Sequence, residues 1–151
     1  MSKKTITLRQ IAFTSASGDN PNTAFKVFEK IKDDSMRVLC KVDVTRAWTR
    51  SDRLELADHL LSNASAEVAK VEWPQQRTKC LAELAQAYEL REQTGRCAEN
   101  LFEALNTAAT IKGSYLQARA LIGLAIIHKQ LTRPTSEAER QVLEEIIYRL
   151  D

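Results

Sequence analysis

The sequence predicts an all-α protein, and two properties of the chain lead to this class. Helix-favouring residue types dominate the composition, whereas only four Gly and three Pro supply turn material for a sheet. The chain also matches itself at an offset of 40 residues, a period typical of stacked helical hairpins. With 151 residues and 44% hydrophobic content, we expect one domain that buries roughly 70% of the surface exposed by its unfolded chain.

The internal match is clearest at small and apolar residues. Each unit of such a repeat leaves an apolar face uncovered, so neighbouring units must stack to bury it. We therefore expect an α-solenoid of three stacked helical hairpins, with units at about residues 33–72, 73–112 and 113–151. The aligned sets are Arg37, Arg77 and Gln117; Cys40, Cys80 and Ala120; Val44, Leu84 and Leu124; Ala47, Ala87 and Ile127; and Trp48, Tyr88 and His128.

The chain before the first full unit is less regular. Residues 1–20 combine β-branched residues with a polar run, a pattern that allows a short helix around residues 5–16. A half-unit helix is expected to begin at Pro21, because Ala24 and Phe28 continue the repeat register backwards. The helical-repeat domain therefore spans residues 21–151.

Each full unit divides into two helices. Pro74 and Pro134 suit a first helical turn, where the missing N–H has no partner in any case. Ser114 and Gln117 have the spacing of a capping box. The first helices are expected at about 35–50, 75–92 and 115–131, and the second helices at about 53–70, 96–111 and 136–150.

The order of residue sizes resembles the tetratricopeptide repeat. Two helices of the second unit carry the pattern: Leu81, Leu84, Ala85 and Tyr88 in the first, and Cys97, Leu101 and Ala104 in the second. A standard unit is near 34 residues, so the resemblance is to extended versions of this repeat. HEAT repeats, which also favour an Arg near a helix start as at Arg37 and Arg77, are the second choice. The resemblance covers about residues 20 to 150 and carries no catalytic residue.

The residues that could carry chemistry have simpler structural interpretations. His128 occupies an aromatic packing position and His59 a helix surface, and neither has a metal-ligating residue at i+4. Cys40 and Cys80 are equivalent small apolar residues, and Cys97 fills a small-residue position. Phosphate loops and nucleophile motifs are absent from the sequence. We therefore expect no enzyme activity, no cofactor and no metal.

Charge and hydropathy limit which partners and which cellular compartment we expect for the protein. The net charge of +2 does not by itself indicate nucleic acid. The sequence contains neither a signal-peptide core nor an apolar run of transmembrane length. Three cysteines without an export signal favour the reducing cytoplasm.

The tetratricopeptide resemblance implies where a partner would bind, because first helices line the concave face of such proteins. The implied set holds five cations against one acid, Glu89, and predicts a basic groove suited to an acidic peptide or a free C-terminal carboxylate. The alternative is that these are ordinary solvated helix positions. The implied residues are Leu39, Val42, Thr49, Ala82, Glu89, Leu90, Ile122 and Gln130, together with the expected partner-binding residues Arg46, Arg50, Lys79, Gln86, Arg119, Ile126 and Lys129.

The expected function is therefore that of a non-catalytic protein-interaction module with an adaptor, chaperone-like or regulatory role. The alternative is a nucleic-acid-binding α-solenoid, in which basic residues contact phosphates and Trp48 or Trp73 stacks on bases. Twenty acidic residues against twenty-two basic ones weaken that alternative.

The expected last helix carries a broad apolar band. Either packing within its own unit covers this band, or a second subunit shares it. We expect a homodimer with two-fold symmetry, formed through Val142, Ile146, Ile147 and Leu150.

Overall fold

The computed structural model of the chain describes residues 10–11, 21–131 and 135–150. These residues form seven α-helices and no β-strand, which confirms the all-α class. Gln10 and Ile11 are helical and exposed, and the rest of the predicted N-terminal helix lies outside the described residues. The helices are α2 (Pro21–Lys30), α3 (Asp34–Arg50), α4 (Leu54–Glu67), α5 (Pro74–Leu90), α6 (Thr94–Ala109), α7 (Ser114–Gln130) and α8 (Glu137–Leu150).

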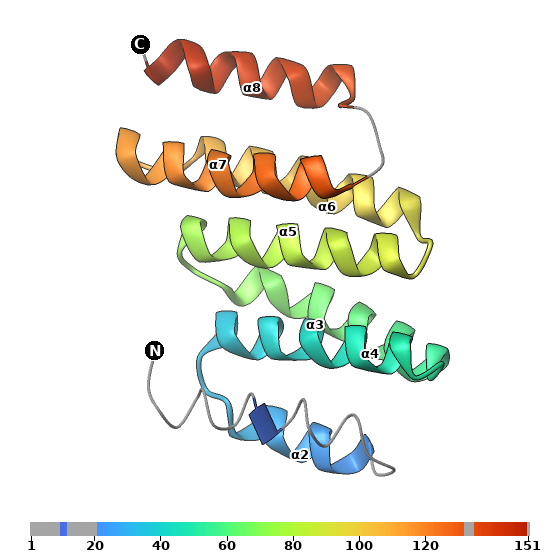
Figure 1. The fold of residues 1–151 in the computed structure, drawn as a ribbon. Helices are drawn as coiled ribbons and strands as arrows, with labels where there is room; N and C mark the ends of the chain where they lie inside the picture. The colour runs from blue at the N-terminus through green and yellow to red at the C-terminus, as the bar shows by residue number, and fades with distance from the viewer. Residues whose placement is uncertain (1–9, 12–20, 132–134, 151) are drawn as a thin grey trace.

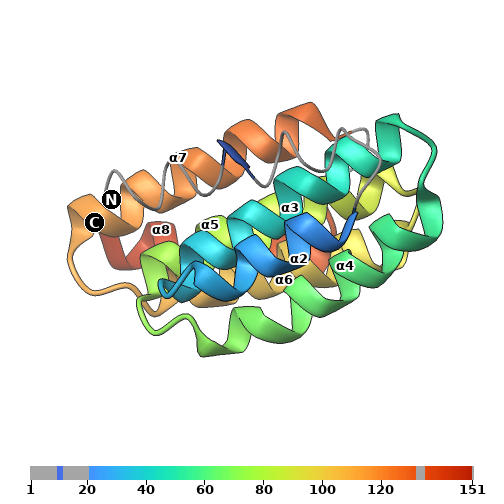
Figure 2. The same cartoon turned by 90° about the horizontal axis from the view of Figure 1, so that it is seen from below.

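The helices are stacked in chain order from α2 at one end to α8 at the other (Figure 1). Helix α3 pairs with α4 and α5 pairs with α6, while α3 also contacts α5 and α5 contacts α7. Helix α8 packs against α6 rather than closely against α7. Figure 2, seen along the stack from the α2 end, shows α7 on the side of the molecule away from α4. The expected third hairpin is therefore more open than the first two.

The offset of 40 residues recurs in the backbone turns of the first two hairpins. Asp52 and Glu92 both adopt left-handed φ angles, 61° and 59°. In each turn the next residue closes the helix end with a backbone hydrogen bond: Arg53 N–H donates to the Trp48 carbonyl at 2.8 Å, and Gln93 N–H to the Tyr88 carbonyl at 2.9 Å. This is the Schellman arrangement, which satisfies carbonyls that a helix end leaves without partners.

Equivalent side chains also tie each first helix to the segment before it. Long polar side chains donate to backbone carbonyls there: Arg37 to Ile31 at 2.7 Å, Arg77 to Val71 at 2.8 Å and Gln117 to Ala108 at 3.1 Å. The capping box predicted from Ser114 and Gln117 is wrong. Gly113, with φ 99°, is the N-cap of α7 and has no side chain to cap it, so Ser114 is not the N-cap, and Gln117 donates to the Ala108 carbonyl at the α6 end instead.

The extent of side-chain burial falls from α3 to α7. Val44, Leu84 and Leu124 are all buried, as their shared register requires. Helix α3 buries residues along its whole length, whereas the described residues of α7 bury only Gln117 and Leu124. No helix in the described part of the chain is long and apolar enough to cross a membrane.

Candidate functional site

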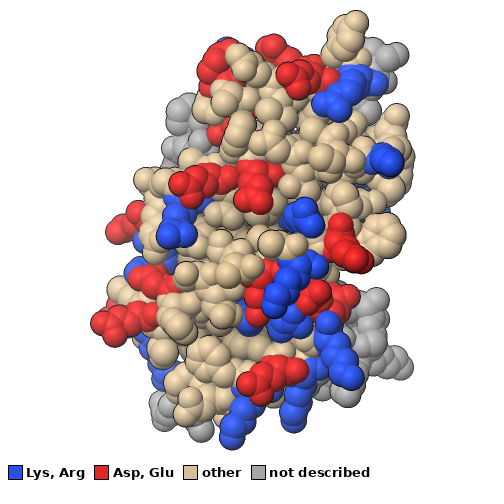
Figure 3. Space-filling view, turned by 180° about the vertical axis from the view of Figure 1, so that it is seen from behind, with Lys and Arg blue, Asp and Glu red and all other residues tan. Residues whose placement is uncertain are grey.

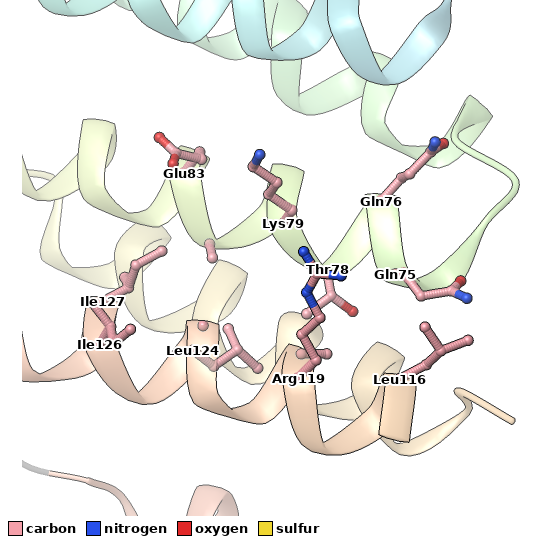
Figure 4. Close-up of a pocket in the computed structure, with 13 residues that line it drawn as sticks. Gln75, Gln76, Thr78, Lys79, Glu83, Leu116, Arg119, Leu124, Ile126 and Ile127 are labelled. Carbon is pink, nitrogen blue, oxygen red and sulfur yellow. The ribbon is translucent and has the colours of Figure 1, made fainter. Parts of the chain in front are cut away.

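A hollow between α5 and α7 gathers several of the predicted partner-binding residues, and we call it the α5–α7 groove (Figure 4). Its volume is about 500 Å³. Two neighbouring first helices form its walls, because α5 and α7 lie side by side in the stack. The groove is lined by Gln75, Gln76, Thr78, Lys79, Ala82, Glu83, Leu116, Arg119, Ala120, Gly123, Leu124, Ile126 and Ile127.

The groove combines apolar walls with two cations and one acid, Glu83, which pairs with Arg46. Lys79 comes from α5 and Arg119 from α7, and Figure 4 shows the Arg119 side chain extending from α7 toward α5 beside Thr78. Neither cation forms an ion pair with a described residue. Ile126, which is 55% exposed, lies on the α7 wall. A ligand with apolar groups and negative charge would complement this lining.

Two buried polar atoms on the α5 wall lack partners. Thr78 is 2% exposed, and its Oγ1 atom makes no hydrogen bond with any residue that the structure describes. The Oε1 atom of Gln75 is likewise buried without a partner. Buried polar groups are normally hydrogen-bonded, and an unmet one costs about 1 to 3 kcal/mol. A ligand that donates hydrogen bonds to these atoms would remove this cost.

Gly123 keeps the floor of the groove open. It lies inside α7, where a Gly costs about 1 kcal/mol relative to Ala. A Cβ atom at this position would meet no atom within 4 Å, so close packing does not require a Gly. The missing side chain leaves free space in the groove, which Gly123 lines.

A second hollow of about 570 Å³ contains Arg46 and Arg50, but Glu89 and Glu92 line it as well. Arg46 donates to Glu83 at 2.6 Å and to the Gln86 side-chain oxygen at 3.0 Å. Asp43 lies 3.8 Å from the Arg46 guanidinium. The sequence count of one acid therefore missed Asp43, one helical turn from Arg46, and Glu83 on the neighbouring helix α5.

Other predicted groove residues lie elsewhere. Leu39 and Val42 are buried, at 7% and 0% exposure, and do not line either hollow. Gln86 donates to the Gln130 side chain at 2.6 Å and lies in the second hollow. Lys129 lines a separate cavity of about 250 Å³ between α6, α7 and α8. The structure thus brings Lys79, Ala82, Arg119 and Ile126 together in one groove, and the other predicted residues do not line it.

Packing within the same chain covers part of the apolar band of α8. Ile146 is fully buried, so the prediction that it lies on a dimer surface is wrong. Val142 is half-buried and packs against the core, whereas Ile147 is 57% exposed. The side chain of Leu150 lies outside the described residues.

The cysteines are buried and form no disulfide. Burial raises the pKa of the Cys80 thiol to about 12, so this thiol stays protonated at neutral pH. No cluster of metal-ligating side chains occurs among the residues that the structure describes. The groove is consequently the strongest candidate site in this part of the chain.

The opposite face of the molecule has a different character. Figure 3 shows acidic and basic side chains interspersed there with uncharged surface, without a large area of one sign.

Comparisons with protein-family models, curated proteins and solved structures found no match to this chain. The interpretation of the groove therefore depends on its own geometry.

Proposed function

We propose that the chain is a non-catalytic protein-interaction module that binds an acidic segment of a partner protein in the α5–α7 groove. The observation that carries this proposal is the buried Thr78 hydroxyl beside two cations, Lys79 and Arg119, none of which has a hydrogen-bond or ion-pair partner among the described residues. Such a module would serve as an adaptor, a chaperone-like factor or a regulatory subunit. Its reduced thiols suit the cytoplasm.

The architecture that we propose is an α-solenoid of the extended tetratricopeptide type. Turn geometry and linker hydrogen bonds that recur at the 40-residue offset support it. Fold alone does not establish function, so the role is argued from the groove.

Each part of the groove would have a separate task in binding. Apolar side chains of the partner would cover Ala120, Leu124 and Ile127, and burial of this area would supply most of the affinity. An acidic side chain beside Lys79 and Arg119 would set orientation and raise the association rate. Ligands without hydrogen-bond donors for Thr78 Oγ1 and Gln75 Oε1 would bind more weakly, because these acceptors would remain unmet.

Peptide selection tests this proposal even though the partner protein is unidentified. A displayed library of random peptides is selected on the full chain, and the affinities of enriched peptides are measured by calorimetry. We expect enrichment of peptides that combine acidic and apolar residues. Arg119→Glu should weaken their binding at least about tenfold, because it reverses a charge at the site.

Three further variants locate the binding site. Gly123→Leu should abolish binding by filling the groove, whereas Gly123→Ala should fold at least as well as the wild type. Thr78→Val keeps the side-chain shape and removes the hydroxyl, and should weaken binding. Lys70→Glu is the matched charge reversal at an exposed position outside the groove and should change nothing. Unchanged affinity in both Arg119→Glu and Gly123→Leu would overturn the proposal.

A further inference from the structure

The outward side of α7 is apolar and uncovered. Tyr115 is 75% exposed and Ile122 is 62% exposed. The two are seven residues apart, so they lie on the same face of the helix. Ile126, at 55%, lies beside them. By contrast, Ala82, which is equivalent to Ile122 in the repeat register, is only 2% exposed on α5. Aligned exposed apolar residues of this kind mark interaction surfaces rather than ordinary solvated helix.

The charges on this side of α7 are all positive. Lys129 continues the line of Tyr115 and Ile122 by a further seven residues, and Arg119 lies nearby on the same side. The α7 segment contains no Asp or Glu. We call Tyr115, Ile122, Ile126 and Lys129 the α7 outer face.

Glu144 and Glu145 of α8 carry the opposite charge. The buried side chains of α8 are Glu139 and Ile146, so the opposite side of the helix faces outward. That side exposes Glu144 and Glu145 together with Ile147, at 57%, and Tyr148, at 84%. We call Glu144, Glu145, Ile147 and Tyr148 the α8 outer face.

We propose that two copies of the chain associate about a two-fold axis, with the α7 outer face of each copy against the α8 outer face of the other. Pairing α7 with α7 would place only positive charges in the contact, and pairing α8 with α8 would bring Glu144 and Glu145 against their own copies. Crossed pairing places opposite charges and apolar side chains together in both contacts. Both helices lie at the same end of the stack, so one axis can form both contacts (Figure 1).

This interface shares Ile126 with the α5–α7 groove, but the residues substituted to test it lie outside the groove. Ile122, Glu144 and Glu145 do not line the groove, so their substitution leaves its walls intact. Failure of the dimer would therefore leave the peptide-binding proposal standing, and the reverse also holds. The positions are exposed, so charged substitutions there should not prevent folding.

Reciprocal charge reversal tests the crossed pairing. An α7 variant, Ile122→Glu with Lys129→Glu, and an α8 variant, Glu144→Lys with Glu145→Lys, are studied by sedimentation at about 50 µM. The wild type should have the mass of a dimer. Each variant alone should self-associate at least about tenfold more weakly, because like charges then face each other. An equimolar mixture should recover dimers that contain one copy of each variant.

Controls make each outcome decisive. Trp73→Glu changes an apolar side chain that is 64% exposed outside both outer faces, and should keep the dimer mass. Circular dichroism should show wild-type helix content in all variants. A monomeric wild type, variants that dimerise as the wild type does, or a mixture of folded variants that stays monomeric would each overturn the proposal.

Discussion

The α3–α4 and α5–α6 hairpins differ from the α7 and α8 region in how much of a shared repeat pattern they bury. Leu81 and Ala85 of α5 are both fully buried, whereas Leu121 and Ala125 at the equivalent positions of α7 are half-buried and exposed. Helix α5 lies between α3 and α7, while α7 packs against α5 and α6. The difference teaches that a repeat pattern marks residues that can be buried, and neighbouring helices decide whether they are.

The connections contribute to the same difference. In the first two hairpins a left-handed residue, Asp52 or Glu92, turns the chain directly into the next helix. Leu131, which follows α7, has an extended conformation instead, with φ −84° and ψ 143°. Helix α8 then packs on α6, and the cavity of about 250 Å³ between α6, α7 and α8 results.

The largest expected effect comes from removing equivalent leucines in the two regions. Leu84→Ala should lower the free energy of unfolding by about 3 to 5 kcal/mol, because Leu84 is fully buried. Leu124→Ala should cost about 2 kcal/mol or less, since Leu124 already borders both the groove and the cavity. Urea unfolding of both variants measures the difference. Equal losses would show that α7 is packed as tightly as α5.

A partly buried ion cluster distinguishes the first hairpin from the other two. Lys41 donates to Glu67 at 2.6 Å and Arg37 donates to it at 3.1 Å, whereas Leu81 and Thr107 occupy the positions equivalent to Lys41 and Glu67. Burial raises the pKa of Glu67, but these hydrogen bonds outweigh it and hold the pKa below its usual 4.5. Glu67→Gln should therefore lower the free energy of unfolding at pH 7 by about 1 to 3 kcal/mol.

The pH dependence of that loss gives an independent check. A lowered pKa in the folded state means that the carboxylate stabilises the fold above pH 4.5, and that this contribution disappears as the pH falls through the folded-state pKa. Denaturant titrations of wild type and Glu67→Gln at several pH values should converge in acid. A difference that is independent of pH would contradict the ionic origin of the stabilisation.

The smallest effects are expected at the turns. Asp52→Gly and Glu92→Gly should each raise the free energy of unfolding by about 0.5 to 1 kcal/mol, because Gly adopts a left-handed φ without the penalty of a Cβ. Leu131→Gly should instead lower it, since Leu131 is buried and its φ is negative. Thermal unfolding of the three variants measures these shifts. Destabilisation by both turn glycines would show that the Asp52 and Glu92 side chains matter more than backbone strain.

The helical class, the repeat offset and the burial of Val44, Leu84 and Leu124 could be predicted, because apolar periodicity depends on local spacing along the chain. The pairing of Arg46 with Glu83 could not, since it depends on how far one side chain reaches across to another helix. The unpartnered Thr78 hydroxyl likewise has no sequence signal. The packing of α8 on α6 depends on the geometry of a connection, which composition does not determine.

Hydrogen exchange of backbone amides tests the contrast between the two regions most directly. In dilute protein, the α5 amides should exchange only through global unfolding, whereas the α7 amides should exchange through a local opening at least about 2 kcal/mol less costly. The amides of Ala85 and Ala125 are the matched pair to compare, because they occupy the same repeat position. Equal protection of these two amides would contradict the account.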